Sequence, residues 1–199
     1  MPKVSSTYIE NRQEKIIIAA RSVFAQKGFT GATMKDVLET ASISRGGLYA
    51  YFKNIEELFI AVLKYDDLEN ATIFTVKSDI SSFYREYNKK MYQIFDELDS
   101  GVNLSQAKSE FLLTHDKKSY PYLGVRVNEL KETMSEFFKD GQKKQFVSKN
   151  IDTYLFSETL LSMIDGILIH ESSTPSTKKN RQMKITSFLE MTELYLKKG

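Results

Sequence analysis

Apolar positions recur along this chain at intervals of three and four residues, the repeat that places side chains on one face of an α-helix. In the first such run, Ile16, Ala20, Val23 and Phe24 share one face, and Gly28 follows where a helix would end in the left-handed conformation. No alternation of the β type extends over any length. The pattern therefore predicts an all-α protein.

Three more short helices are predicted within about the first 65 residues. The second begins after Thr33, whose hydroxyl is placed to cap free backbone amides, and the third runs from Ser44 to about Phe52. The fourth follows Asn54, another residue suited to capping. Because residues 41–43 leave only a short turn between the second and third helices, we interpret this pair as a helix-turn-helix unit.

Longer helices are predicted beyond residue 64. Their apolar stripes cover residues 80–98, 104–115, 123–141 and 151–170, and a last stripe runs from 185 to 196. Pro121, Gly141 and the polar stretch 171–177 separate them. The expected architecture is a small N-terminal helical domain followed by a larger helical one.

Composition narrows the class of protein further. With 199 residues, 9 Gly, 3 Pro and dense charge of both signs, the chain is typical of a folded helical protein. No stretch approaches the ~20 apolar residues that span a bilayer, and residues 1–14 lack the apolar core of a secretory signal, so no membrane partner is expected. The absence of cysteine excludes disulfides, a thiolate nucleophile and a cysteine-based zinc site, and it is compatible with the cytoplasm.

Charge is distributed unevenly, although the net charge is only +2. Residues 1–53 hold eight basic and four acidic side chains, whereas the remainder holds 20 basic and 22 acidic ones. A basic N-terminal segment, residues 1–53, followed by a slightly acidic remainder suits an anionic partner that binds the N-terminal segment. Random scatter of charges over solvated surfaces is the alternative interpretation.

The third predicted helix carries the most informative pattern. Leu48 and Phe52 lie four residues apart and are expected to face the core, which leaves Arg45 and Tyr49 together on another face. An arginine can hydrogen-bond guanine through two donors, and an aromatic edge can meet a thymine methyl group or a phosphate. The helix therefore suits the major groove of duplex DNA.

Two adjacent glycines, Gly46 and Gly47, lie inside this short helix. Each costs a helix interior about 1 kcal/mol relative to alanine, so a steric reason is expected. Close approach of the backbone to DNA is one explanation. Close packing against the first helix is the other, and both remain open because they involve opposite faces.

The segment from Thr33 to Lys53 resembles the operator-binding domain of TetR/AcrR-type repressors. The shared pattern consists of Thr33 with Val37, the run Ser44–Phe52, and the pair Glu57-Leu58. The resemblance is specific over roughly the first 60 residues and weaker beyond them. It implies a helix-turn-helix DNA-binding domain over residues 1–55 and a ligand-binding and dimerisation domain over 56–199.

The resemblance also implies a set of DNA contacts. Phosphate contacts are expected from Thr33, Ser44, Tyr49, Tyr51 and Lys53, and base contacts from Arg45, Gly46 and Tyr49, with Gly47 completing the DNA-binding candidates. Many family members place a lysine two residues after the position of Lys53, where this chain has Ile55, so one phosphate contact is expected to be missing. A helical hairpin without any role in DNA binding is the alternative for the whole segment.

The last two helices are implied to pair with those of a second subunit. The stripe Leu155, Thr159, Ser162, Gly166 and Ile169 fits this, because small residues at a four-residue spacing let helices approach closely. Burial of the stripe within one subunit is the alternative.

An apolar or aromatic small-molecule effector is expected inside the larger domain. Candidate pocket residues are Phe83, Tyr87, Met91, Phe111, Phe137, Tyr154 and Met163, with Glu110 available to a cationic group. The plainer interpretation makes the apolar residues ordinary core and Glu110 a solvated carboxylate. His115 and His170 form no metal-binding pair, so no metal or cofactor is predicted.

Together these observations predict a ligand-responsive transcriptional regulator, a repressor that binds a pseudo-palindromic DNA operator as a homodimer and is released by its effector. An enzyme is the first rival, but the chain lacks Gly-x-Ser-x-Gly, a phosphate-cradling glycine loop and His-Glu-x-x-His. A helical bundle that binds only proteins is the second rival. It would show no salt-dependent binding to duplex DNA.

Overall fold

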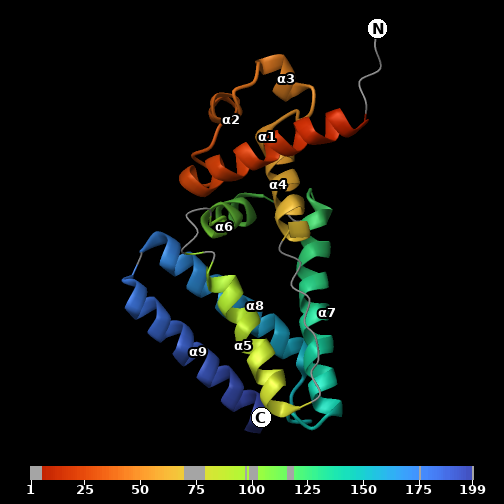
Figure 1. Ribbon diagram of the computed structural model, residues 1–199, viewed down its shortest axis with the longest axis vertical. Coiled ribbons are helices and arrows are strands. Elements are labelled where there is room, and N and C mark those ends of the chain that lie inside the picture. Colours follow the sequence, from red (N-terminus) through yellow and green to blue (C-terminus); the bar gives the residue numbers. More distant parts are fainter. Residues whose placement is uncertain are drawn as a thin grey trace. The chain divides into compact units, whose positions relative to one another are not determined.

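A computed structural model describes residues 6–69, 79–96, 98, 103–115, 119–174 and 176–198, with only the backbone given for residues 6–10, 68 and 69. These described residues form α-helices and no strand (Figure 1), which confirms the all-α prediction. None of the helices described is long and apolar enough to cross a membrane. Packing divides the chain into two compact units.

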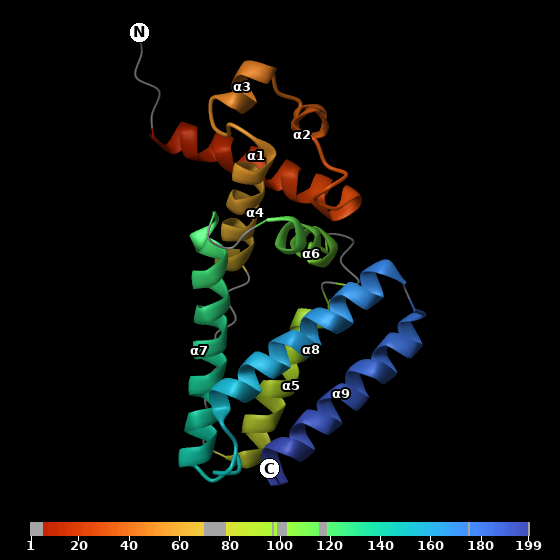
Figure 2. The same ribbon diagram turned by 180° about the vertical axis from the view of Figure 1, so that it is seen from behind.

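The N-terminal unit consists of α1 (Ser6–Lys27), α2 (Met34–Ala41), α3 (Arg45–Tyr49), α4 (Ile55–Glu69) and α6 (Ser105–Thr114). Helix α1 packs against α2, α4 and α6. Figures 1 and 2 show α2 and α3 together on one side of α1 and α6 on the other. The unit is therefore assembled from two separate stretches of the chain.

Predicted helix boundaries hold where a cap defines them. Gly28 has a φ of +69° after α1, Thr33 accepts a hydrogen bond from the amide of Asp36 at 3.2 Å, and Ser44 accepts one from the amide of Gly47 at 3.2 Å. Asn54 likewise accepts a hydrogen bond from the amide of Glu57 at 2.8 Å. These four predictions are confirmed.

One predicted boundary was wrong, and the first helix is longer than its apolar stripe. Helix α3 ends at Tyr49 rather than Phe52, because the amides of Tyr51 and Phe52 both donate to the carbonyl of Leu48, which tightens the chain into a turn. Helix α1 begins at Ser6, ten residues before the apolar stripe that predicted it. A stripe of apolar residues marks only the part of a helix that packs on a core.

Helix α6 joins the N-terminal unit through an aromatic cluster. The ring of Phe29, from the turn after α1, lies 5.1 Å from Phe59 of α4 and 4.8 Å from Phe111 of α6, measured between centroids. His115 stacks on Phe111 at 4.2 Å. Such aromatic pairs stabilise a fold beyond the area that they bury.

A buried carboxylate reinforces this assembly. Asp66 of α4 is only 4% exposed, and it accepts hydrogen bonds from Arg21 of α1 at 2.9 Å and from Lys108 of α6 at 3.3 Å. Its charge is therefore compensated from two helices. The domain division predicted at residue 55 stays a prediction about function, but packing places α4 and α6 with the first three helices.

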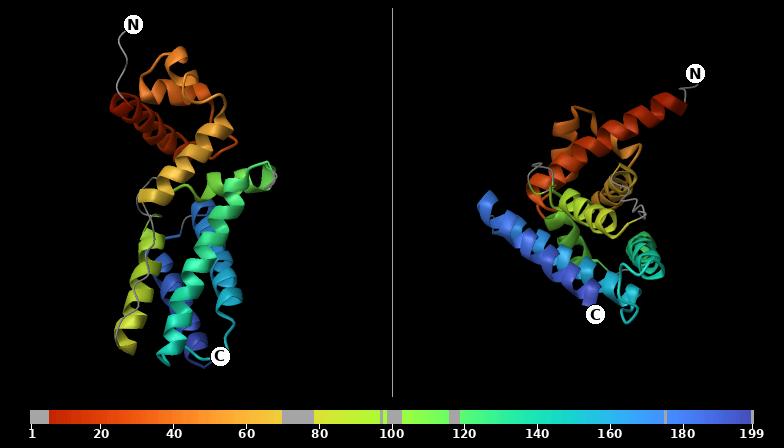
Figure 3. Two further views of the ribbon diagram at one scale, coloured as in Figure 1. Left: turned by 90° about the vertical axis from the view of Figure 1, so that its right-hand side faces the viewer. Right: turned by 60° about the horizontal axis from the view of Figure 1, so that its bottom comes forward.

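The C-terminal unit consists of α5 (Ile80–Asp96), α7 (Pro121–Lys143), α8 (Thr153–Ser173) and α9 (Lys178–Lys198). Helix α7 packs along α8, and α5 packs against α9 (Figure 3). Phe83 and Phe137 stack at 4.4 Å in its core, and the hydroxyl of Tyr87 donates to Thr192 at 2.8 Å. The aromatic side chains of α5 and α7 thus fill the space between the helices.

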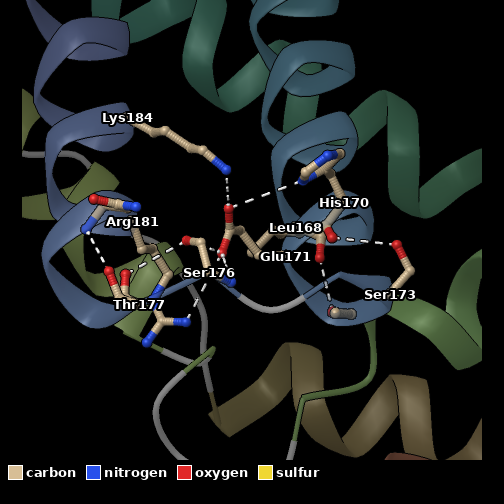
Figure 4. Close-up of polar contacts among 10 residues, drawn as sticks. Leu168, His170, Glu171, Ser173, Ser176, Thr177, Arg181 and Lys184 are labelled. Carbon is tan, nitrogen blue, oxygen red and sulfur yellow. Dashed lines mark hydrogen bonds and ion pairs between the residues drawn. The ribbon is translucent and has the colours of Figure 1, made fainter.

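The corner between α8 and α9 contains a buried charge. Figure 4 shows Glu171 accepting hydrogen bonds from Lys184 at 2.6 Å and from the hydroxyl of Ser176 at 2.7 Å. Its side chain is 1% exposed, with Arg181 3.9 Å away. Burial opposes ionisation of Glu171, but the hydrogen bonds from Lys184 and Ser176 outweigh it and lower its pKa to about 2.

Candidate nucleic-acid interface

Helix α3 presents the two side chains that the sequence singled out. Leu48 is fully buried and Phe52 nearly so, and they anchor the segment in the N-terminal unit. Arg45 and Tyr49 are exposed, with the guanidinium carbon of Arg45 5.5 Å from the centroid of the Tyr49 ring. A cation held over an aromatic ring restricts both side chains. The outward pair predicted from the four-residue spacing is therefore present.

The structure distinguishes between the two glycines of α3. A Cβ built on Gly46 would meet nothing within 4 Å, so no packing inside this chain requires a glycine there. A Cβ on Gly47 would lie 3.3 Å from the hydroxyl of Ser44 and 3.6 Å from the guanidinium of Arg12. Packing against α1 can therefore explain a glycine only at position 47. At Gly46 the helix backbone is left uncovered by side chains of this chain.

The start of α2 is closed by a reciprocal cap. The amide and the hydroxyl of Thr33 both donate to Asp36, at 2.9 and 2.7 Å, while Asp36 also accepts from the ammonium of Lys27 at 2.5 Å. Hydrogen bonds from Lys27 and then Thr33 lower the pKa of Asp36 to about 2. Both donors of Thr33 thus serve the cap, and a phosphate at this end of α2 needs other donors.

The remaining candidates follow α3 or precede it. Lys53 and Ser44 are exposed, and Tyr51 is half-buried. The amide of Lys53 donates to Glu57 at 2.8 Å, which orients the chain at the start of α4 and leaves the ammonium as the group available to a partner. Ile55 is half-buried as the first residue of α4, in agreement with its predicted place in the apolar stripe of that helix.

Two basic residues near these helices escaped the sequence reasoning. The guanidinium of Arg12, on α1, lies next to Gly47 of α3, and the side chain of Lys35, near the start of α2, is 82% exposed. Neither belongs to an apolar periodicity or to the motif. For Arg12 the signal is its position beside Gly47 of α3, which only the three-dimensional structure shows, whereas Lys35 lies two residues after the N-cap Thr33, a position that the sequence contains.

Five of the predicted pocket residues lie together in one buried core. Phe83, Tyr87, Met91 and Phe137 are buried in the core of the C-terminal unit, and Met163 packs against that core. This matches the plainer interpretation of a stripe of apolar residues. Two surface hollows of this unit, one along α9 and one beside the start of α5, are lined by other side chains.

Three further pocket candidates lie elsewhere. Tyr154 is exposed on α8, with the ammonium of Lys131 5.2 Å from its ring centroid. Phe111 belongs to the aromatic cluster of the N-terminal unit. Glu110, also in that unit, accepts hydrogen bonds from the amide of Thr30 at 2.8 Å and from Gln106 at 2.8 Å. Glu110 is partly exposed, and its hydrogen bonds within this unit were not predicted.

Helices α8 and α9 expose apolar side chains along their length. Leu155 and Ile169 of the predicted stripe are exposed, and so are Thr159, Ser162 and Gly166 between them. The hydroxyls of Thr159 and Ser162 donate to carbonyls of their own helix, at 2.9 and 3.0 Å, which satisfies their donors. On α9 the exposed apolar side chains are Met183, Met191, Leu194 and Tyr195.

A short capped helix that carries an arginine and a tyrosine on its open face, set across a tight turn from a second helix, defines the class of helix-turn-helix DNA-binding regulators. Residues 16–62 match the family model described as bacterial regulatory proteins of the tetR family. The N-terminal segment is thus similar to the helix-turn-helix domain of TetR-type transcriptional regulators, and the resemblance noted in the sequence is confirmed over residues 16–62.

Individual relatives agree with this assignment. The chain is 29% identical to the HTH-type transcriptional regulator YfiR of Bacillus subtilis, over 98% of this chain and 95% of that protein. It is 37% identical to the HTH-type transcriptional repressor AcnR of Corynebacterium diphtheriae, over 37% of this chain and 38% of AcnR. The fold is similar to that of the fatty acid degradation regulator FadR of Bacillus halodurans, with a TM-score of 0.73 at 16% identity, covering 100% of this chain and 98% of FadR.

Proposed function

We propose that this protein is a homodimeric repressor that binds a pseudo-palindromic DNA operator and releases it when a small apolar or aromatic effector binds. The observation that carries the proposal is the open face of α3. Arg45 and Tyr49 stand exposed there beside Gly46, whose backbone has open space above it. A helix with that surface fits the major groove, where its backbone approaches the bases closely.

The contacts divide into two kinds in this proposal. Arg45 reads a base through its two-pronged guanidinium, with Tyr49 beside it. Lys53, Ser44 and Tyr51 contact phosphates, which positions the helix without reading sequence. At the start of α2, where both donors of Thr33 are occupied, the exposed Lys35 takes over the phosphate contact.

Dimerisation through α8 and α9 accounts for the apolar side chains that these helices expose. Gly166 has nothing within 4 Å of a built Cβ, and Ser162 lies one turn before it, so a second helix can approach the backbone closely here. Two subunits related by a two-fold axis present two copies of α3. The operator therefore consists of two matching half-sites.

The effector acts by shifting a population between two arrangements of the dimer. If it binds better to the arrangement with low operator affinity, each ligand weakens the other by the same coupling free energy, typically about 1–3 kcal/mol. We place this action in the cytoplasm, where the operator DNA lies, and we assign the protein no catalytic role.

Selection of binding sites from a random duplex library at low ionic strength tests the proposal. The expected result is one pseudo-palindromic site whose affinity falls steeply with salt. Tyr49→Ala should weaken binding to that site, whereas Tyr122→Ala, which removes a half-buried tyrosine from α7, outside the proposed dimer helices, should not. A wild-type protein that retains no duplex at low salt contradicts the proposal.

A further inference from the structure

Glu110 of α6 makes a contact that could not be predicted from its residue type or from its position in the sequence. Its carboxylate accepts hydrogen bonds from the amide of Thr30 at 2.8 Å and from the hydroxyl of Thr30 at 3.0 Å, across 80 positions of sequence. Thr30 lies in the turn between α1 and α2. A side chain of α6 thus holds the backbone of the turn that leads into α2.

Gly28 makes room for this contact. A Cβ at Gly28 would lie 2.6 Å from one carboxylate oxygen of Glu110 and 2.7 Å from the other. The same residue has a φ of +69°, in the left-handed region. Gly28 therefore uses two separate properties of glycine. Its conformational freedom allows the positive φ, and its missing side chain leaves space for the carboxylate of Glu110.

The environment of the carboxylate favours its charged form. Burial raises the pKa of Glu110, but the hydrogen bonds from Thr30 and Gln106 outweigh burial, and the net shift is downward. Hydrogen bonds to an ionised acceptor are roughly twice as strong as neutral ones. The contact is thus a charge-assisted clamp on the turn.

The clamped turn determines where α2 starts. Only Gly31 and Ala32 separate Thr30 from Thr33, the N-cap of α2, and the amide of Ala32 donates to the carbonyl of Phe29 at 3.3 Å. Lys27, at the other end of the turn, pairs with Asp36 inside the first turn of α2. The backbone between α1 and α2 is therefore tied at both ends and, by Glu110, in its middle.

We propose that Glu110 is a positioning residue for DNA binding, which holds the N-terminal end of α2 against the operator phosphate through Thr30 without touching DNA itself. The inference rests on the proposed function, because it assigns α2 a phosphate contact. It gives α6 a direct part in operator affinity through the turn between α1 and α2. Lys108 and Phe111, which join α6 to α4, keep Glu110 in place.

The test compares Glu110→Ala and Glu110→Gln in the full chain with Glu132→Ala, which removes the same charge from an exposed site on α7. Hydrogen exchange of the Thr30 amide is measured without DNA, and affinity for the selected duplex is measured over a range of salt. Glu110→Ala should speed exchange at Thr30 and weaken DNA binding about tenfold, although loss of a negative charge alone favours DNA. The salt slope should fall by about one, the signature of one lost phosphate contact.

The conservative variant separates positioning from general destabilisation. Glu110→Gln keeps a carbonyl acceptor for the Thr30 amide and should recover most of the affinity, while Glu132→Ala should change neither exchange nor salt slope. Faster exchange at Thr30 with affinity and slope equal to those of Glu132→Ala would overturn the inference alone. A wild-type protein that binds no duplex would overturn the proposed function, and this inference with it.

Discussion

The two compact units of this protein expose opposite kinds of surface. The N-terminal unit displays a cation, a phenol and bare backbone on α3, a helix of only five residues. The C-terminal unit displays leucine, isoleucine and methionine along α8 and α9, which have 21 residues each. Both surfaces are unusual for a protein that has no partner, because exposed apolar side chains and bare helical backbone are both costly in isolation.

This difference shows why one surface is easier to recognise from sequence than the other. The candidate DNA contacts all fall within residues 33–53, where caps and a short turn determine which side chains face outward. Leucine and methionine on α8 and α9 are the same residue types that fill the core of that unit. Their type does not reveal whether they face the core or the solvent, so position on the helix has to decide.

Gly166→Leu, on the apolar surface of α8, should have the largest effect, which is a weaker dimer. The subunit has open space at this position, and leucine favours a helix over glycine by about 1 kcal/mol, so the subunit should stay folded. A bulky side chain between two closely packed helices should weaken the dimer about a hundredfold, or about 3 kcal/mol. Sedimentation equilibrium measures this. Gly124→Leu, at a second open position on α7, is the control, and equal dimer constants for both variants would refute an α8–α9 interface.

Arg45→Ala should cost roughly 2 kcal/mol in discrimination at one or two base pairs of the half-site. The reason is that the variant loses a two-pronged contact to a base rather than a phosphate contact. Competition binding against single-base variants of the operator measures it. Arg85→Ala, an exposed arginine on α5, provides the charge-matched control. A uniform loss across all sequences would remove Arg45 from base recognition.

Glu171→Gln should lower the free energy of unfolding at pH 7 by about 2 kcal/mol, because Lys184 and Arg181 lose a buried counter-charge. The pKa of Glu171 is lowered from 4.5 to about 2, so its contribution is fully present above pH 4.5 and is lost as the pH falls through that interval. Denaturant unfolding between pH 2 and 7 should show this loss in the wild type. The variant should lose less stability than the wild type over this interval, because Asp36 and Glu110, whose pKa values are also lowered, still contribute to the loss. Glu132→Gln should resemble the wild type.

Lys53→Ala should weaken binding to every duplex by about 1 kcal/mol and reduce the salt slope by about one, the behaviour of a phosphate contact. Affinities measured at several salt concentrations on specific and random duplexes test this. Were the loss confined to the specific duplex, the division between Arg45 and Lys53 would be wrong.

Gly46→Ala should have the smallest effect, and its sign differs between two measurements. In the free protein it should stabilise α3 by about 0.5 kcal/mol, because alanine favours a helix and meets no neighbour. On DNA the added methyl group should reduce affinity, because it stands between backbone and bases. Thermal unfolding and duplex binding together measure both signs. Unchanged affinity would mean that α3 does not approach DNA at this residue.

Much of the N-terminal unit could be predicted from local sequence. The caps at Thr33, Ser44 and Asn54 depend on residues three positions apart, and the structure contains all three. The outward pair of Arg45 and Tyr49 follows from a four-residue spacing in the same way. Local rules were less accurate where a helix tapers into a turn, as α3 does before Phe52.

Contacts between distant parts of the chain could not be predicted. Glu110 lies on α6 with nothing around it in sequence that indicates Thr30, and Arg12 lies beside Gly47 only because α1 extends ten residues before its apolar stripe. The role of the pocket candidates could not be predicted for a related reason. Aromatic residues at helical spacing are needed for any helical core, so Phe83 and Phe137 could be core or pocket, and they are core.

The aromatic cluster of Phe29, Phe59 and Phe111 has a practical consequence for engineering. A chimera that transplants only residues 1–69 onto another sensor would carry Phe29 and Phe59 without the ring that covers them. The transplanted head would also lack the ammonium of Lys108 that compensates Asp66. Exchange of DNA specificity between such regulators therefore requires α6 to travel with the first four helices, or its cluster to be rebuilt in the recipient.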